Sequence, residues 1–398
     1  MKYVVILGDG MADIPSEKLG GKTPLDVAKK PNIDKICAMG EIGMCQTVPD
    51  GFKPGSDVAN LSVMGYDPHE YYTGRSPLEA VSMGVEVLPS DTTFRTNIVT
   101  LSDEENYEDK TMVDYSSGEI TTEEGREIVK AVNDVLGTEE FQFFGGISYR
   151  HLLLWHTPVK EIEFTPPHDI SGRKIKEYLP KDEFMTKLMK KSYEILKDHP
   201  VNKKRIERGL NPANSIWMWG QGKKPLLSPF EEKFGVKGAV ISAVDLVKGI
   251  GICAGMQSID VEGATGNVDS NFDGKARAAI EALKTNDFVY IHMEAPDESG
   301  HHFDPAAKVL SIELIDEKVV GPVYDALCGS GEDFAFLIMP DHPTPIDIGT
   351  HTSDPVPYAI YCSGEPKNCG LSYNEKNAEG KAFVENGSML MNIFINKK

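Results

Sequence analysis

A short, continuous run of apolar and β-branched residues, followed at once by polar residues, occurs three times along the chain. The three segments are YVVIL (3–7) before Gly8-Asp9-Gly10, FVYIHME (288–294) before Ala295-Pro296-Asp297, and FAFLIM (334–339) before Pro340-Asp341-His342. Such runs are typical of parallel strands buried on both faces. A helical pattern over 273–286 precedes the second run, and another over 305–327 separates the second run from the third. This alternation predicts a doubly wound α/β core with a mostly parallel sheet.

The region 80–179 has a different pattern, typical of an antiparallel, half-exposed sheet. Its strand-like segments are DTTFRTNIVTL, FQFFGGISYRHLLLWH and VKEIEFTPP. Residues 122–137 form an amphipathic helical pattern with Thr121 or Thr122 as N-cap and Gly137 as C-cap. A chain of 398 residues is too long for one ordinary core. We therefore expect an inserted α+β cap domain at 80–179. The core domain is expected at 1–79 and 180–398, with two helices between 180 and 212 returning the chain to it.

Composition narrows the class of protein. The chain is 40% hydrophobic and 26% charged, and its formal net charge is -20. Such a surface repels nucleic acid and anionic membranes. The six cysteines are scattered without a CxxC pair, which favours reduced thiols and a cytoplasmic protein. No window approaches the roughly 20 apolar residues of a membrane span. A negative protein that binds a small anion needs metals or arginines in its pocket.

Acids and imidazoles gather where the three apolar runs end. Ligands bind beyond the carboxyl ends of the strands in doubly wound sheets, and six polar residues fall at or just after these ends: Asp9, Asp297, His301, Asp341, His342 and His351. Individually, Asp9 could be a turn aspartate and Asp297 with His301 a helix-capping cluster. Together, carboxylates mixed with imidazoles suit Mn, Zn, Mg or Co. The set is large enough for two divalent metal ions, an arrangement that supports phosphoryl transfer.

Ser56 is the candidate nucleophile. It follows Pro54-Gly55 and begins a short helical pattern, VANLSVMG. A serine there could be an ordinary N-cap. The same position places its hydroxyl at the positive end of the helix dipole, which favours phosphate, and a metal would lower the hydroxyl pKa.

These motifs resemble the archaeal-type cofactor-independent phosphoglycerate mutases, metalloenzymes of the alkaline phosphatase superfamily. The resemblance rests on four stretches: GDGMAD, GSDVANLSVMGYDP with YYTGRSPLEA, PDESGHHFD, and MPDHPTPIDIGTHTSDPVP. It implies an alkaline-phosphatase-like core and a small anionic phosphorylated substrate. It also implies interconversion of 3- and 2-phosphoglycerate through a transient phosphoserine at Ser56, in a closed cleft that excludes water. The resemblance leaves the identity of the ions and the oligomeric state open.

The resemblance also assigns roles to residues. Asp9, Ser56, Asp341 and His342 match the ligands of one metal, and Asp297, His301 and His351 match those of the other. In the cap, Arg75, Arg95 and Arg150 match positions where the family carries arginine, which suits carboxylate and phosphate recognition. His151 and His168 are further candidates for substrate contacts. Four residues remain candidates for proton transfer: His151, His168, Asp169 and Asp114.

One stretch departs from the family pattern. Where the family carries an arginine-rich segment, this chain has VDYSSGEI, residues 113–120. A homoserine kinase-like phosphotransferase on the same core is therefore an alternative, and a metal-dependent phosphatase is another. The sequence contains no P-loop or kinase glycine loop for ATP. A noncatalytic scaffold would lack a ligand or the serine, and none is missing.

Overall fold

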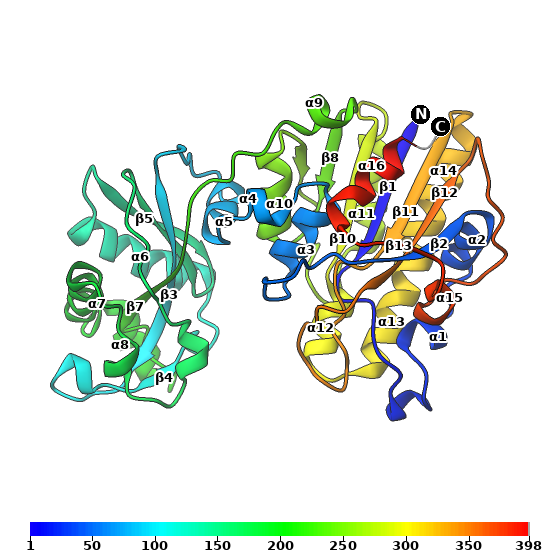
Figure 1. The fold of residues 1–398 in the computed structure, drawn as a ribbon. Coiled ribbons are helices and arrows are strands. Elements are labelled where there is room, and N and C mark those ends of the chain that lie inside the picture. Colours follow the sequence, from blue (N-terminus) through cyan, green and yellow to red (C-terminus); the bar gives the residue numbers. More distant parts are fainter. Residues whose placement is uncertain (397–398) are drawn as a thin grey trace. The chain divides into compact units, whose positions relative to one another are not determined.

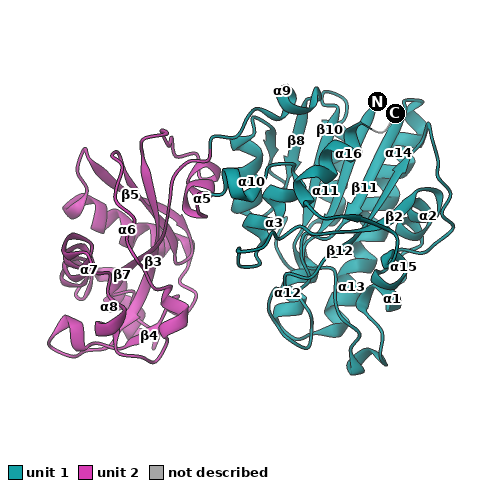
Figure 2. Cartoon of the chain, in the orientation of Figure 1, with its two compact units in different colours: residues 1–72, 226–398 teal, residues 73–225 magenta. Residues whose placement is uncertain are grey.

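The computed structural model describes residues 1–396. The described chain divides into two compact units (Figure 2): unit 1 is Met1–Tyr72 with Leu226–Lys398, and unit 2 is Thr73–Pro225. Unit 2 is thus inserted into unit 1. None of the described helices combines the length and apolar character that a bilayer crossing requires.

Unit 1 is built on a sheet that has eight strands within the described residues. Its spatial order is β13 (Ala382–Val384), β2 (Glu41–Cys45), β12 (Val356–Cys362), β11 (Phe334–Met339), β1 (Lys2–Gly8), β10 (Phe288–Met293), β8 (Gly238–Ile241) and β9 (Gln257–Ile259). β1 pairs in parallel with both β10 and β11, and β12 runs antiparallel to its two neighbours. The three apolar runs are therefore adjacent central strands. The predicted mostly parallel sheet is confirmed.

Helices cover both faces of this sheet (Figure 1). On one face, Val4, Ile291 and Phe336 belong to a core that includes Ile36, Ala279 and Ile312 from the helices. On the other, the ring of Tyr3 contacts Phe394 edge-on. The helices of unit 1 are α1 (Pro24–Val27), α2 (Pro31–Met39), α3 (Ser56–Val63), α4 (Pro68–Tyr71), α9 (Phe230–Phe234), α10 (Asp245–Cys253), α11 (Phe272–Ala282), α12 (Ala295–His301), α13 (Pro305–Ile315), α14 (Gly321–Ser330), α15 (Glu375–Ala378) and α16 (Leu390–Ile395). A π-helical turn, Asp316–Val320, joins α13 to α14.

Unit 2 is an antiparallel sheet packed against helices. Its strands are β3 (Thr92–Leu101), β4 (Met112–Asp114), β5 (Phe141–Ile147), β6 (Arg150–Trp155) and β7 (Ser215–Gly222), and its helices are α5 (Ser76–Ser82), α6 (Thr122–Leu136), α7 (Glu183–Leu196) and α8 (Pro200–Glu207). β3 pairs with β4, β6 and β7. The Thr121 hydroxyl caps α6 by accepting from the Glu124 amide, and Gly137 follows the last turn. The helix and both of its caps match the prediction.

The cap domain expected at 80–179 is narrower than the inserted unit of the structure, Thr73–Pro225. Residues 180–225 lie in unit 2, because α7 and β7 pack on the same core as β3 and α6. Helices α7 and α8 therefore do not return the chain to unit 1, as the sequence pattern had suggested. At the base of unit 2, Thr73 and Lys223 are joined by two hydrogen bonds: the Thr73 hydroxyl donates to the Lys223 carbonyl (2.5 Å), and the Lys223 amide donates to the Thr73 carbonyl (3.2 Å).

The segment VKEIEFTPP is not a strand, contrary to expectation. The side chain of Gln221 occupies its backbone groups instead: Oε1 accepts from the Ile162 amide (2.9 Å), and Nε2 donates to the carbonyl of Lys160 (3.0 Å). The apolar positions of the segment, Val159, Ile162 and Phe164, nevertheless pack against the core of unit 2, which accounts for the alternating pattern.

Candidate metal centre and arginine cluster

The carboxyl ends of β1, β10 and β11 bring the predicted ligands together in unit 1. The Asp9 amide donates to the carbonyl of Met293 (2.9 Å), which ties the loop after β1 to the end of β10. The amide of Gly10 donates to Asp341 Oδ1 (3.1 Å), which ties the same loop to the end of β11. Gly10 has φ of +60°, and a Cβ there would lie 2.6 Å from Asp297 Oδ1. Only glycine fits this turn without displacing a candidate ligand.

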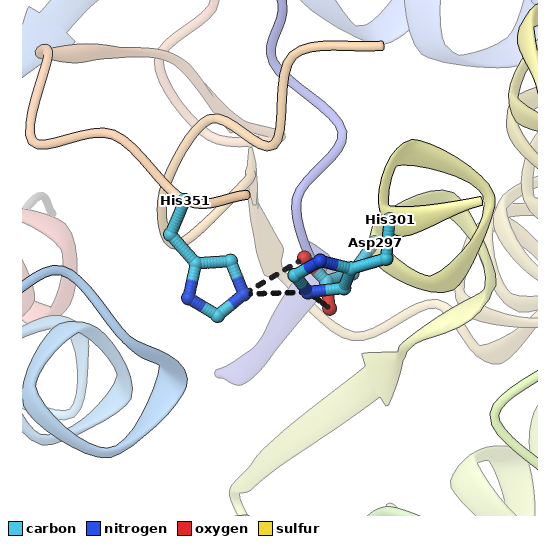
Figure 3. A group of neighbouring side chains, drawn as sticks. All are labelled: Asp297, His301 and His351. Atoms are coloured by element: carbon cyan, nitrogen blue, oxygen red, sulfur yellow. Dashed lines mark hydrogen bonds and ion pairs between the residues drawn. The ribbon is translucent and has the colours of Figure 1, made fainter. Parts of the chain in front are cut away.

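One group of candidate ligands consists of Asp297, His301 and His351 (Figure 3), whose ligand atoms lie within 4.8 Å of one another. Nε2 of His301 is 3.2 Å from Asp297 Oδ2, and Nε2 of His351 is 3.3 Å from Asp297 Oδ1. The two imidazole Nε2 atoms are 2.9 Å apart. His301 Nδ1 lies 3.0 Å from the Gly349 carbonyl. A carbonyl can only accept, so Nδ1 carries a hydrogen and Nε2 is the nitrogen available to a cation.

A second group within the same 4.8 Å limit consists of Asp9, Asp297 and His342, all three buried. Asp297 belongs to both groups. Asp341 lies beside the second group, with Oδ2 3.4 Å from His342 Nε2. The structure therefore brings together all six predicted ligands at the carboxyl ends of three neighbouring strands.

The electrostatics of this cluster fit a bound cation. Burial, followed by the nearby charges of Asp341, Asp297 and Glu294, raises the pKa of Asp9 well above its usual range. Burial alone would raise the pKa of Asp297 too, but hydrogen bonds with His301 and His351 hold it well below its usual range. Asp9 Oδ1 is buried and has no hydrogen-bond partner among the described residues. Buried carboxylates in such numbers need compensating positive charge. Mixed oxygen and imidazole donors suit a divalent metal.

Ser56 is the first residue of α3, and Gly55 is its N-cap. Its Oγ lies 3.2 Å from His342 Nε2, so the hydroxyl faces the second ligand group. Asn60, one turn further along α3, donates from Nδ2 to both the Ser56 carbonyl (2.9 Å) and Asp341 Oδ2 (2.7 Å). The helix is thereby fixed against the end of β11, and Ser56 is held at the candidate metal centre.

Three predicted arginines, Arg75, Arg95 and Arg150, lie in unit 2, and the guanidinium groups of Arg95 and Arg150 lie over aromatic rings. Arg95 pairs with Glu79 (Nε–Oε2 3.0 Å), and its guanidinium lies 4.3 Å from the centre of the Trp219 ring. Burial lowers the pKa of Arg95; Glu79 opposes this shift, while Arg75 and Arg150 add to it. Arg75 and Arg150 are therefore each close enough to Arg95 to repel its charge. Such a cluster attracts anions.

His168 joins this arginine cluster, and His151 does not. The His168 ring lies 5.4 Å from that of Trp219, and Arg95 and Arg75 contribute to lowering its pKa after burial. His151 is buried against Gly125 of α6, and its Nδ1 accepts from the Gly146 amide (2.9 Å). Because His151 and Arg150 are consecutive on β6, their side chains point to opposite faces of the sheet. Burial lowers its pKa to about 3. A direct substrate contact by His151 is therefore not compatible with its position.

Residues 113–120, the segment that differs from the family pattern, lie beside the arginine cluster through Tyr115. Its ring contacts Tyr149 (5.8 Å) and His168 (6.0 Å) edge-on. Asp114 fixes the turn by accepting from the amides of Ser116 (2.8 Å) and Gly118 (2.6 Å). Asp114 thus has a structural task, and its position does not favour it as a proton-transfer group.

Sequence reasoning missed several residues that contact the ligands. They are His292 beside Asp9, with Ser242 behind it on the other ring nitrogen, Asn60 beside Asp341, and Thr344, whose hydroxyl donates to Asp297 Oδ1. His292 stands within one of the apolar runs, and a histidine in a buried strand was the available signal. Asn60 and Thr344 stand within two of the quoted stretches, GSDVANLSVMGYDP and MPDHPTPIDIGTHTSDPVP, whereas Ser242 lies outside all of them.

Comparison with known proteins finds similar chains along the whole sequence. Residues 37–202 match the family model of 2,3-bisphosphoglycerate-independent phosphoglycerate mutase. A Geobacter sulfurreducens protein described as a probable 2,3-bisphosphoglycerate-independent phosphoglycerate mutase is 50% identical over 402 residues, covering 100% of both chains. A Methanosarcina barkeri relative with this mutase name is 50% identical over 404 residues, again covering 100% of both chains. The solved cofactor-independent phosphoglycerate mutase of Thermoplasma acidophilum is 26% identical, with a TM-score of 0.68 and 99% coverage of each chain.

Proposed function

Because the chain belongs to the 2,3-bisphosphoglycerate-independent phosphoglycerate mutase family, we propose that it interconverts 3-phosphoglycerate and 2-phosphoglycerate through a phosphoserine at Ser56. The observation that carries the proposal is the 3.2 Å approach of Ser56 Oγ to His342 Nε2, within a buried cluster of carboxylates and imidazoles. Free thiols at all six cysteines support a cytoplasmic location.

Two divalent ions, drawn from Mn, Zn, Mg or Co, are the proposed cofactors. Asp9, Asp341, His342 and Ser56 would hold one, and Asp297, His301 and His351 the other. The position of Asp297 in both ligand groups supports a site in which the two ions are neighbours. When bound, such ions stabilise charge on phosphoryl oxygens and lower the pKa of a coordinated hydroxyl.

The proposed reaction has two transfers. Ser56 Oγ attacks the phosphorus of 3-phosphoglycerate, the bond from phosphorus to the 3-oxygen breaks, and the proton lost by Ser56 is balanced by the proton gained at the 3-oxygen. Glycerate then reorients, its 2-oxygen attacks the phosphoserine, and Ser56 recovers its proton. The 9% exposure of Ser56 supports transfer over hydrolysis, because buried surroundings limit access of water.

Recognition of the substrate carboxylate is assigned to unit 2. Arg75, Arg95 and Arg150 supply positive charge in a protein whose formal net charge is -20. Stacking on Trp219 and pairing with Glu79 hold the Arg95 guanidinium in one orientation. A guanidinium fixed in this way suits planar, bidentate recognition of a carboxylate.

Parallel assays on one preparation test the function. Protein supplied with Mn²⁺ should convert 3- to 2-phosphoglycerate without added 2,3-bisphosphoglycerate. It should neither phosphorylate homoserine with ATP nor release phosphate from an aryl phosphate at a comparable rate. Phosphorylation of homoserine as the dominant reaction would replace the proposal with a kinase on the same core. Dominant release of inorganic phosphate would replace it with a phosphatase.

A further inference from the structure

We propose that His292, supported by Ser242, is a positioning residue that directs one oxygen of Asp9 toward the metal. The inference rests on the proposed function, because it concerns the same metal centre. It adds two residues to that centre for which the sequence motifs assign no role.

His292 is a fully buried side chain on β10, directly beside Asp9. Its Nε2 lies 2.8 Å from Asp9 Oδ2, and its Nδ1 lies 3.1 Å from the hydroxyl of Ser242. Ser242 is fixed in turn, because its Oγ accepts from the amide of Val244 (2.9 Å). The backbone of His292 is also held, since the buried Lys275 ammonium donates to its carbonyl (2.8 Å).

The chemistry of these partners sets the direction of each hydrogen bond. With a cation bound, the Asp9 carboxylate is ionised and has no hydrogen to donate, so Nε2 of His292 carries the hydrogen and donates to Asp9 Oδ2. Nδ1 of the neutral ring is then an acceptor, and the Ser242 hydroxyl donates to it. The ring nitrogens of His292, the Ser242 hydroxyl and Oδ2 of Asp9 therefore all have hydrogen-bond partners.

One carboxylate oxygen of Asp9, Oδ2, is held by a hydrogen bond, and the other, Oδ1, is left available to a cation. Oδ2 is taken by His292, whereas Oδ1 has no hydrogen-bond partner in the described part of the chain and lies 3.5 Å from Nε2 of His342. The Asp9 backbone is fixed by its hydrogen bond to Met293. A carboxylate held this way offers a single oxygen in a defined direction, as an outer partner of a metal ligand does.

The second aspartate of the centre is supported from the same strand. Asp341 Oδ2 accepts from Asn60 Nδ2 (2.7 Å), and Asn60 Oδ1 accepts from the Tyr290 hydroxyl (2.7 Å). Tyr290 and His292 are two positions apart on β10 and so share one face of the sheet. β10 therefore supports a metal carboxylate at the end of each of two other strands, β1 through His292 and β11 through Tyr290 and Asn60.

Equilibrium binding of Mn²⁺ to the intact protein, measured by competition with a chromogenic chelator, tests the role of His292 independently of activity. His292→Leu removes the donor and should raise the Mn²⁺ dissociation constant about 10- to 100-fold, the range found when outer partners of metal ligands are lost. His292→Gln places an amide donor near the position of Nε2 and should recover most of the affinity. Tyr3→Phe removes a buried hydrogen bond at the far end of β1 and is the control for general destabilisation.

Dissociation constants for His292→Leu and the parent that agree within about two-fold would overturn the inference, since loss of an outer partner typically costs at least about ten-fold. If His292→Leu does not fold, Ser242→Ala decides: weaker Mn²⁺ binding supports the chain, and unchanged binding overturns it. Failure of the mutase proposal would appear differently, as a parent protein that binds Mn²⁺ but does not interconvert phosphoglycerates.

Discussion

At the scale of single residues, two serines on α3 differ in what surrounds them. Ser56 Oγ faces His342 Nε2, whereas Ser62 Oγ is buried and has no hydrogen-bond partner within the described chain. Both belong to the same helix and are small and buried. Their difference in function therefore comes from the atoms that each hydroxyl meets.

Ser56→Ala removes the proposed nucleophile, and mutase activity should fall by on the order of 10⁴-fold or more, as in enzymes that lose a covalent nucleophile. The phosphoenzyme formed with labelled 3-phosphoglycerate should disappear. Ser62→Ala is the matched control and should keep activity within about two-fold, because surface or buried changes away from a site leave its chemistry intact. Undiminished turnover by Ser56→Ala would remove the covalent mechanism.

Arg150 lies at the edge of the arginine cluster, and its side chain is exposed. Arg150→Ala should raise KM for 3-phosphoglycerate about 10- to 100-fold, because a hydrogen bond to a charged group contributes about 1.5–3 kcal/mol. The circular dichroism spectrum should not change. Arg173→Ala, which loses an exposed guanidinium whose partner is the Tyr178 hydroxyl, should leave KM unchanged. Equal KM values for both variants would exclude Arg150 from substrate recognition.

His151 should make unit 2 less stable in acid. Burial lowers its folded-state pKa to about 3, below the usual histidine value of 6.5. Its contribution to the free energy of unfolding is therefore fully present above about pH 6.5. This contribution is lost as pH falls toward 3, at up to about 1.4 kcal/mol per pH unit, because the unfolded state binds a proton that the folded state does not. His151→Asn removes this titration and retains an acceptor for the Gly146 amide.

All three tryptophans, Trp155, Trp217 and Trp219, lie in unit 2, so urea unfolding followed by tryptophan fluorescence reports on this unit. Between pH 7 and pH 5 the parent should lose about 2 kcal/mol more than His151→Asn. Parallel pH profiles of the two proteins would contradict the neutral, buried state of His151.

At the scale of elements, the loop from β11 to β12 is held by Gly349. Its carbonyl accepts from His301 Nδ1, its φ is +73°, and a Cβ there would lie 2.2 Å from the ring of Phe303. Phe303 itself has φ of +56°, an unusual conformation for an aromatic residue. A glycine at 349 thus lets the loop carrying His351 approach α12 closely.

Gly349→Ala should weaken Mn²⁺ binding about ten-fold through the displaced loop. Gly331→Ala is the matched control, since Gly331 has φ of +74° but no atom within 4 Å of an added Cβ. The left-handed conformation should cost both variants about 1–2 kcal/mol of stability, and Gly349→Ala should lose more because of the overlap with Phe303. Equal Mn²⁺ affinities of the two variants would show that the loop carrying His351 tolerates displacement.

The elements that the sequence predicted best are those with an unambiguous local pattern. β1, β10 and β11 are continuous apolar runs, and α6 carries both its amphipathic face and its caps within 17 residues. The segment 159–167 was misread because an alternating pattern states that one face packs, not what it packs against. Here Val159, Ile162 and Phe164 pack against the core of unit 2, while the side chain of Gln221 hydrogen-bonds backbone groups of the segment.

The candidate ligands were predictable for the same local reason, because each follows a strand end. His292 was not recognised because its partner Asp9 is 283 positions away. Similarly, α7 and α8 have clear helical patterns, but their assignment to unit 2 depends on contacts with β7 and α6. Sequence patterns located the chemistry, and long-range packing determined which side chains support it.

At the scale of the whole molecule, metal binding should stabilise unit 1 selectively. Asp9, Asp297 and Asp341 lie in three segments of unit 1 that a bound cation would hold together, whereas unit 2 contains no such ligand group among the described residues. A ligand present at 100 times its dissociation constant stabilises the folded state by about 2.7 kcal/mol.

Hydrogen exchange of the intact protein with Mn²⁺ and with EDTA measures this selectivity. Chelation should accelerate exchange in the segments 9–12, 295–303 and 341–352, and leave α6 and β6 unchanged. Loss of protection spread evenly over both units would indicate global destabilisation instead.

The central place of β1 has a consequence for synthesis on the ribosome. This strand lies between β10 and β11, so its two neighbours begin at residues 288 and 334. If synthesis proceeds at roughly 5–20 residues per second, β1 has no strand to pair with for tens of seconds after its own synthesis. Unit 2 is continuous in the chain and emerges meanwhile. It therefore completes its fold first, while the oldest part of the nascent polypeptide stays exposed and open to chaperones.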